Sequence, residues 1–227
     1  MLFAHSYLGK LVHIELLGDR DKMGYLVDAG PDVFVIYMDK KYVYVPSAHV
    51  KTIKLNTEDK TNTDTAPDPI NQTGAITFIL VLHNAIDKFV EIYISDHQSI
   101  HGYVKAIAQD YLVFYSQFYK TMYIPLDHLK WITPFESDQT PYSLDQKHLS
   151  KEVIEGSVNA LPPTFEQLMK GLEGEMVGID SGLKANKIGL LQTINNSFVE
   201  LITAEELKFH YNLQHIKNCI PLKKESE

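Results

Sequence analysis

Residues 42–53 read YVYVPSAHVKTI, and the same phrase returns at residues 121–132 (TMYIPLDHLKWI) and at residues 208–219 (KFHYNLQHIKNC). In each copy a strand-like run leads into a turn, and a histidine then precedes an aliphatic residue and a lysine. The aligned histidines are His49, His128 and His215. An internal repeat constrains the fold more strongly than any local signal, so we base the prediction of the fold on this repeat.

A glycine also stands upstream of each histidine, at nearly constant spacing. The glycines and the histidines therefore repeat independently with nearly the same period. We interpret residues that recur in this way as fold elements rather than catalytic groups, and we expect the glycines to allow sharp bending of strands. The predicted fold elements are Gly24, Gly102, Gly189, Pro46, Pro125, His49, His128 and His215.

Each repeat contains five short segments that favour β-strands. They are rich in Val, Ile and Tyr, which pack well on a pleated surface. Five short antiparallel strands in so small a unit would close on themselves to avoid open edges. The sequence therefore predicts a mainly β protein made of three tandem small barrels. In the first repeat the segments are residues 11–17, 24–27, 33–38, 42–45 and 50–53.

Two polar stretches separate the repeats. Residues 56–73 are rich in Asn, Thr, Asp and Pro, which is typical of a flexible linker, and residues 136–160 are longer and more mixed. The predicted organisation is barrel 1 at 1–55, a linker at 56–73, barrel 2 at 74–135, a linker at 136–160, and a helix with barrel 3 at 161–223.

A short helix is clear before the third barrel. Thr164 fits an N-cap, and Gln167 stands three residues later, as in a capping box. Apolar residues follow at helical spacing, and Gly171 and Gly174 end the segment. A weaker helical pattern covers residues 75–86.

The composition disfavours several classes of protein: nucleic-acid-binding, disulfide-rich, membrane and secreted proteins. The net charge is −8 and Arg20 is the only arginine, whereas nucleic-acid binding depends on phosphate neutralisation by Lys and Arg. The single cysteine, Cys219, excludes an internal disulfide framework and suggests a buried thiol. No apolar run reaches the length of a membrane helix, and the start of the chain lacks a secretory pattern. We therefore expect a protein made and kept inside a cell.

No motif of catalysis or metal binding appears. The sequence has no HExxH, no Cys pair, no glycine-rich phosphate loop and no nucleophile elbow. The three aligned histidines fall in separate barrels, so we expect each to serve its own turn rather than share an ion. We predict no enzymatic activity, no cofactor and no metal.

Bent strands with a tight turn between the fourth and the fifth resemble the Sm-like (SH3-type) fold. RNA-binding members of that class contact RNA through the loops after strands two and four. The loop after the second strand corresponds to residues 28–32, 108–110 and 195–197. In the turn after the fourth strand, the chain has the aligned histidines but lacks the basic residue of the Sm signature. The resemblance implies an alternative function, Sm-like RNA binding, which the charge balance disfavours.

Three stretches are similar to the tandem repeat of the spore coat protein B family of endospore-forming bacilli. They read FEQLMKGLEG at 165–174, KIGLL at 187–191 and FHYNLQHIK at 209–217. The Arg-Gly-Gly-Pro-Glu stretch usual in that family is replaced here, for example by residues 180–184, and the Ser- and Lys-rich tail of some members is absent. The resemblance implies a structural component of the spore coat or surface, assembled in the mother-cell cytoplasm.

Taken with the absent catalytic motifs, the resemblance favours a structural interaction protein whose partners are coat proteins or further copies of itself, with no membrane and no nucleic acid. We expect the barrels to pair side by side through the edges of their fourth and fifth strands, within the chain or between chains. The candidate interface residues are Tyr123, Ile124, Leu129, Trp131, Phe209 and Tyr211.

Overall fold

The computed structural model describes residues 2–18, 20–56, 75–95, 98–135 and 161–222. The chain divides into two compact units, Met1–Ile100 with Leu129–Ser137, and His101–His128 with Asp138–Glu227. The boundary between the two units falls inside the second repeat.

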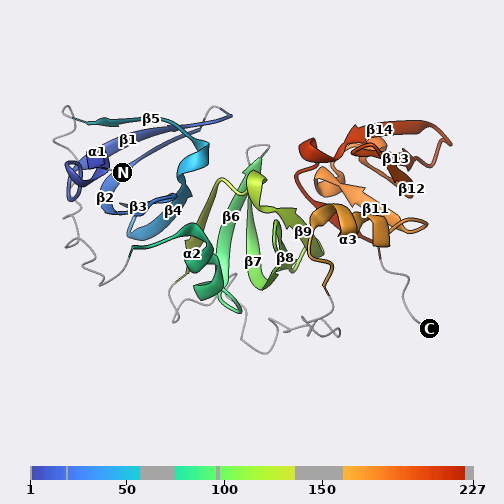
Figure 1. The fold of residues 1–227 in the computed structure, drawn as a ribbon, viewed down its shortest axis with the longest axis horizontal. Helices are drawn as coiled ribbons and strands as arrows, with labels where there is room; N and C mark the ends of the chain where they lie inside the picture. Colours follow the sequence, from blue (N-terminus) through green and yellow to red (C-terminus); the bar gives the residue numbers. More distant parts are fainter. Residues whose placement is uncertain (1, 19, 57–74, 96–97, 136–160, 223–227) are drawn as a thin grey trace. The chain divides into compact units, whose positions relative to one another are not determined.

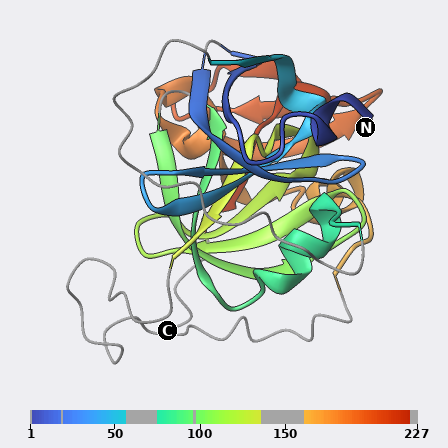
Figure 2. The same ribbon diagram turned by 90° about the vertical axis from the view of Figure 1, so that its left-hand side faces the viewer.

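The chain is mainly β, as the ribbon drawings show (Figures 1 and 2). The strand pairs among the described residues are antiparallel. Three short α-helices occur among the described residues: α1 Leu2–His5, α2 Phe78–Asn84 and α3 Phe165–Gly171. No helix in the described ranges is both long enough and apolar enough to cross a membrane.

The first repeat lies entirely in the first unit, with the strand order β4-β3-β2-β1-β5. Alternation places Val12, Ile14 and Leu16 of β1 in the core, as expected for a strand with one buried face. The strands are β1 Leu11–Leu16, β2 Arg20–Ala29, β3 Val33–Met38, β4 Lys41–Pro46 and β5 Val50–Leu55.

The third repeat lies in the second unit and has the corresponding order, β14-β13-β12-β11-β15. Its strands are β11 Met176–Ile179, β12 Ile188–Asn195, β13 Phe198–Ile202, β14 Lys208–Asn212 and β15 Cys219–Pro221. Two repeats with different sequences thus reach one topology, in which the fifth strand pairs with the first and the fourth strand lies at the opposite end.

The strands of the second repeat are β6 Phe89–Ser95, β7 Gln98–Ile107, β8 Tyr111–Ser116, β9 Lys120–Pro125 and β10 Trp131–Pro134. In the first unit β10 pairs with β6, and in the second unit β8 pairs with both β7 and β9. These pairings match the corresponding strands of the other two repeats.

The predicted closure of each repeat into a barrel is not confirmed, because the strand order is open. The fourth strand of one repeat pairs instead with the fifth strand of the next: β4 with β10, and β9 with β15. The backbone groups that closure was expected to satisfy find their partners in the neighbouring repeat, so closure is not needed to protect these edges.

The three aligned glycines let the third strand of a repeat approach its second strand closely. A Cβ atom on Gly102 would lie 2.0 Å from the Tyr115 carbonyl oxygen, and one on Gly189 would lie 2.2 Å from the Ile202 carbonyl oxygen. Two residues after each glycine the register shifts, which marks a β-bulge that bends the strand. The shifts fall between Leu26 and Asp28, between Val104 and Ala106, and between Leu191 and Thr193.

The histidine phrase forms the same turn three times. A 3₁₀ turn connects the fourth and fifth strands of each repeat, and the aligned histidine is its last residue. Pro46 and Pro125 are the last residues of β4 and β9. Asn212 stands at the same place in the third repeat, where its side chain accepts a hydrogen bond from the Gln214 amide at 3.0 Å. The turns are η1 Ser47–His49, η2 Leu126–His128 and η7 Leu213–His215.

The predicted helix before the third repeat is confirmed as α3. The Thr164 hydroxyl accepts from the Gln167 amide at 3.3 Å, and Phe165, Leu168 and Met169 are buried. The weaker pattern at 75–86 yields α2, which Thr77 caps in the same way.

Candidate protein interaction site

The first junction between repeats pairs β4 with β10, so that Tyr44 faces Ile132. Trp131 of β10 lies in a hydrophobic cluster made mostly of first-repeat residues and is 4% exposed. Its ring stacks on Tyr93 with centroids 3.9 Å apart, and the Lys22 Nζ lies 3.9 Å from the ring centroid. The two repeats therefore share one core at this junction.

The second junction pairs β9 with β15, so that Tyr123 faces Cys219. Burial raises the pKa of the Tyr123 hydroxyl, and it raises the pKa of the Cys219 thiol to about 12. A thiol this protonated and fully buried acts as a small core residue rather than a nucleophile. Tyr111 of the second repeat lies in the same cluster as the third-repeat core, with its ring centroid 6.1 Å from that of Tyr123.

The two bridged pairs occupy equivalent places in the repeated phrase. Tyr44 and Tyr123 are the third residues of their phrases, and Ile132 and Cys219 are the twelfth residues of the phrases that follow. The two junctions are thus the same contact made twice.

A carboxylate adds a second contact between successive repeats. Asp32, in the turn before β3, accepts a hydrogen bond from the Phe78 amide at the start of α2 (2.9 Å). Asp110, in the turn before β8, accepts from the Phe165 amide at the start of α3 (2.7 Å). An acid at a helix start satisfies an otherwise orphaned N–H.

Sequence reasoning placed these two acids at the position where Sm-like proteins contact RNA, and it missed their role as helix caps. The signal available was an Asp at the same turn of two repeats, each followed in sequence by a helix that begins the next repeat.

The predicted interface residues fall into three groups. Tyr123 and Trp131 lie at the junctions, whereas Ile124 and Leu129 are fully buried core residues. Phe209 and Tyr211 lie on β14, which ends the strand order of its unit, and their rings stack with centroids 6.1 Å apart. The Tyr211 hydroxyl donates to the Asn186 carbonyl at 2.6 Å, and the Lys187 Nζ lies 3.9 Å from its ring centroid.

Two of the aligned histidines line one cavity of about 540 Å³ in the second unit, with Asp110, Asp127 and Glu166 also in its wall. His128 Nε2 donates to the Gln214 carbonyl at 2.9 Å, which joins the turn of the second repeat to the turn of the third. His49 belongs to the other unit. In the part of the chain that the structure describes, no three His, Cys, Asp or Glu side chains are grouped so that they could hold a metal.

Burial lowers the pKa of His128 from its ordinary value of 6.5, against the Gln214 carbonyl and the charges of Asp127 and Asp180, which raise it, while Lys217 lowers it slightly further. A lowered folded-state pKa means that the neutral ring favours the folded protein. This contribution is complete above the unfolded-state pKa and is lost as the pH falls through 6.5 towards the folded-state pKa.

We expect the substitution His128→Gln to lower the free energy of unfolding by about 0.5–1.5 kcal/mol at neutral pH, because one inter-repeat hydrogen bond is weakened. The difference from the wild type should shrink on acidification, because the wild type alone loses the contribution of the neutral ring. Urea titrations at several pH values measure it, and a difference that grows as the pH falls would contradict the assignment.

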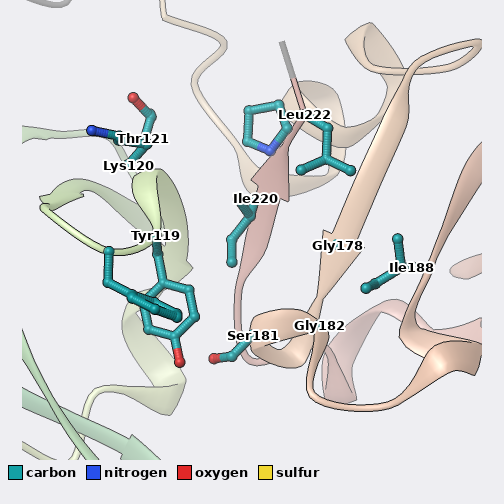
Figure 3. A pocket seen from close by; sticks show the side chains of 11 residues that line it. Tyr119, Lys120, Thr121, Gly178, Ser181, Gly182, Ile188, Ile220 and Leu222 are labelled. Atoms are coloured by element: carbon teal, nitrogen blue, oxygen red, sulfur yellow. The ribbon is translucent and has the colours of Figure 1, made fainter.

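A groove of about 610 Å³ runs beside the second junction. Figure 3 shows Ile220, Ile188 and Leu222 on one side and Tyr119 on the other, with the Ser181 hydroxyl at one end. Phe118, which is 83% exposed, also belongs to its lining. Among the described residues the lining is predominantly apolar, with Lys120 as its one charged side chain, which suits the contact surface of a protein better than the binding of a charged ligand.

Sequence comparison gives three findings. A family model described as YwrJ third domain matches residues 164–219. The uncharacterized protein YwrJ of Bacillus subtilis strain 168 is 34% identical over 219 residues, which cover 94% of this chain and 96% of that protein. Spore coat protein B of the same organism is 27% identical over 148 residues, which cover 65% of this chain but only 36% of the longer relative.

Proposed function

The chain belongs to the YwrJ family, and from this premise we propose that it is a non-enzymatic structural protein of the spore coat or spore surface, which acts through contacts between its repeats and with other coat proteins. Synthesis in the mother cell, without a cofactor, is part of the proposal. The observation that carries it is the pair of equivalent buried junctions, because a repeat that presents one edge to the next is a unit of assembly.

The similarity to spore coat protein B supports the location. That relative is named as a coat protein, and the similarity covers 65% of this chain. We further propose that each repeat is an opened form of the Sm-like five-stranded unit. The order fourth-third-second-first-fifth, seen in the first and third repeats, supports this.

RNA binding, the alternative drawn from the Sm-like resemblance, is not favoured. Asp32 and Asp110, at the position that would face RNA, are engaged with the amides of Phe78 and Phe165. A net charge of −8 with one arginine provides little attraction for phosphate.

The proposal is tested by locating a tagged copy produced during sporulation of Bacillus subtilis. We expect it in the coat fraction of purified spores, released only by denaturing extraction, because contacts with other coat proteins would hold it in an insoluble layer. The same tag on an unrelated monomeric protein is the control. Recovery of the chain in the soluble mother-cell lysate, with none in the coat, would refute the proposal.

A further inference from the structure

We propose that the chain associates head to tail, with the edge of β14 (Lys208–Asn212) of one copy pairing with the edge of β5 (Val50–Leu55) of a second copy. The inference deepens the proposed structural role by naming a partner, a further copy of this chain. It rests on the repetition of one contact along the molecule rather than on the exposure of a surface.

The formed junctions define which edges match. A fourth strand meets the fifth strand of the following repeat, at β4–β10 and at β9–β15. The fifth strand of the first repeat, β5, ends the strand order of the first unit, and the fourth strand of the third repeat, β14, ends that of the second unit. One of them is a fourth-strand edge and the other is a fifth-strand edge. A third junction of the same kind would therefore join β14 of one copy to β5 of another copy.

The register of this third junction follows from the other two. The third residue of one phrase faces the twelfth residue of the next, as Tyr44 faces Ile132 and Tyr123 faces Cys219. Applied to the end strands, the same rule places His210 opposite Ile53 of the next copy. His215 would then lie against the Ala48 carbonyl, as His128 lies against the Gln214 carbonyl.

The backbone of β14 is oriented for such pairing. The Leu213 amide donates to the Ser197 carbonyl, and hydrogen bonding alternates along an antiparallel pair. Tyr211 and Phe209 therefore bond to β13, while the amide and carbonyl of His210 point to the outer edge.

The backbone of β5 fits in the same way. The Asn56 amide donates to the Leu11 carbonyl, so Lys54 and Thr52 bond to β1, and the backbone groups of Ile53 point outward. Both members of the proposed pair thus direct their donor and acceptor away from their own sheet, as the members of the formed pairs do.

The residues at the formed junctions are more deeply buried than the equivalent residues at the proposed third junction. Ile132 and Cys219 are fully buried, whereas Ile53 at the equivalent position is only half-buried. The side chain of His210 is 58% exposed, whereas Tyr44 and Tyr123 are partly buried at their junctions. Both sides of the third contact therefore have surface left to cover.

The contact between copies should be weaker than the junctions within the chain. Ser197 stands immediately before β13, where Asp32 and Asp110 stand before β3 and β8, so the carboxylate that caps the next helix is missing. Lysines on both edges discourage indiscriminate pairing, and Lys208 and Lys51 are each held by a carboxylate of their own sheet, Glu200 at 2.7 Å and Glu15 at 3.0 Å. The association is therefore reversible and register-specific.

Light scattering on the purified full chain tests the association. The average mass should rise about twofold or more as the concentration increases from about 1 to about 100 µM. His210→Pro removes the outward-facing amide together with the imidazole, which lies 3.5 Å from Glu200; an edge strand tolerates the loss of that amide, and the variant should abolish the rise. His210→Ala, which keeps that amide, should retain it. A wild type that stays monomeric, or a His210→Ala variant that fails like His210→Pro, would overturn the proposal.

Disulfide trapping tests the register. A mixture of His210→Cys and Ile53→Cys chains should form a linked heterodimer on mild oxidation, and His210→Cys mixed with Lys54→Cys should not, because the Lys54 side chain lies on the other face of β5. The native Cys219 is buried and stays unreactive. Linkage of His210→Cys to itself would overturn head-to-tail pairing, and so would a chain that carries both His210→Cys and Ile53→Cys and forms the disulfide only within itself.

These outcomes are independent of the spore location. A chain that remains monomeric yet enters the coat would refute the pairing and leave the proposed function standing. A chain that pairs in solution yet stays out of the coat would do the reverse.

Discussion

The substitution Gly102→Ala is expected to lower the free energy of unfolding of the second unit by about 3 kcal/mol or more. The added Cβ would lie 2.0 Å from the Tyr115 carbonyl oxygen and 2.9 Å from a ring carbon of Phe114. A backbone oxygen cannot swing away as a flexible side chain can, so β7 and β8 would have to separate beside their bulge. Urea denaturation followed by far-ultraviolet circular dichroism measures the change.

Gly171→Ala is the matched control. Gly171 ends α3, and a Cβ there would meet nothing within 4 Å. Alanine favours a helix over glycine, so this variant should be neutral or gain up to about 1 kcal/mol. Equal effects of the two substitutions would show that the repeated glycine does not serve close strand approach.

The substitution Trp131→Ala is expected to cost about 3–5 kcal/mol in the first unit. Trp131 comes from the second repeat but lies buried among first-repeat residues such as Val43 and Phe34, and stacks on Tyr93. Truncation would leave a cavity in a core shared by two repeats, so both should loosen together. The same denaturation experiment measures the loss.

Phe118→Ala is the comparison for Trp131→Ala, because it also removes an aromatic ring but from a side chain that is 83% exposed. Its effect on stability should stay within about 0.5 kcal/mol. If Trp131→Ala cost no more than Phe118→Ala, the first junction would not be the stabilising contact described here.

Local order was largely predictable from the sequence. The repeated phrase at 42–53, 121–132 and 208–219 sets two strands and a turn in each repeat, and the structure has a 3₁₀ turn at each histidine. The pattern from Thr164 to Gly171 produced the expected capped helix. These features depend on side chains a few residues apart, which a sequence displays directly.

The closure of the sheets was not predictable in the same way. Whether a fourth strand such as β4 turns back to its own repeat or pairs with β10 depends on backbone groups, which are identical in every residue. Strand propensity signals an edge but not its partner. From the sequence we expected closed barrels that also pair through their fourth and fifth strands; the structure has such pairs, β4–β10 and β9–β15, but its strand order is open.

The helix caps were missed for a related reason. Asp32 and Phe78 are far apart in sequence, and only the junction brings the carboxylate to the amide. From the sequence alone, an acidic residue in a turn is interpreted as solvent-exposed, because the arrangement of the strands is not known. Trp131 was among the predicted interface residues, but its sequence context did not indicate that its ring would lie in the core of the first repeat.

Amide hydrogen exchange at low protein concentration tests the central claim, that one kind of strand-edge contact joins successive repeats and is left unmade at β5 and β14. The outward-facing amides of Tyr44 and Tyr123 lie at formed junctions, and the equivalent amide of His210 does not. We expect Tyr44 and Tyr123 to exchange about 100-fold or more slowly than His210, because only they are hydrogen-bonded to the next repeat. Fast exchange at all three amides would show that the repeats are independent and would contradict the account.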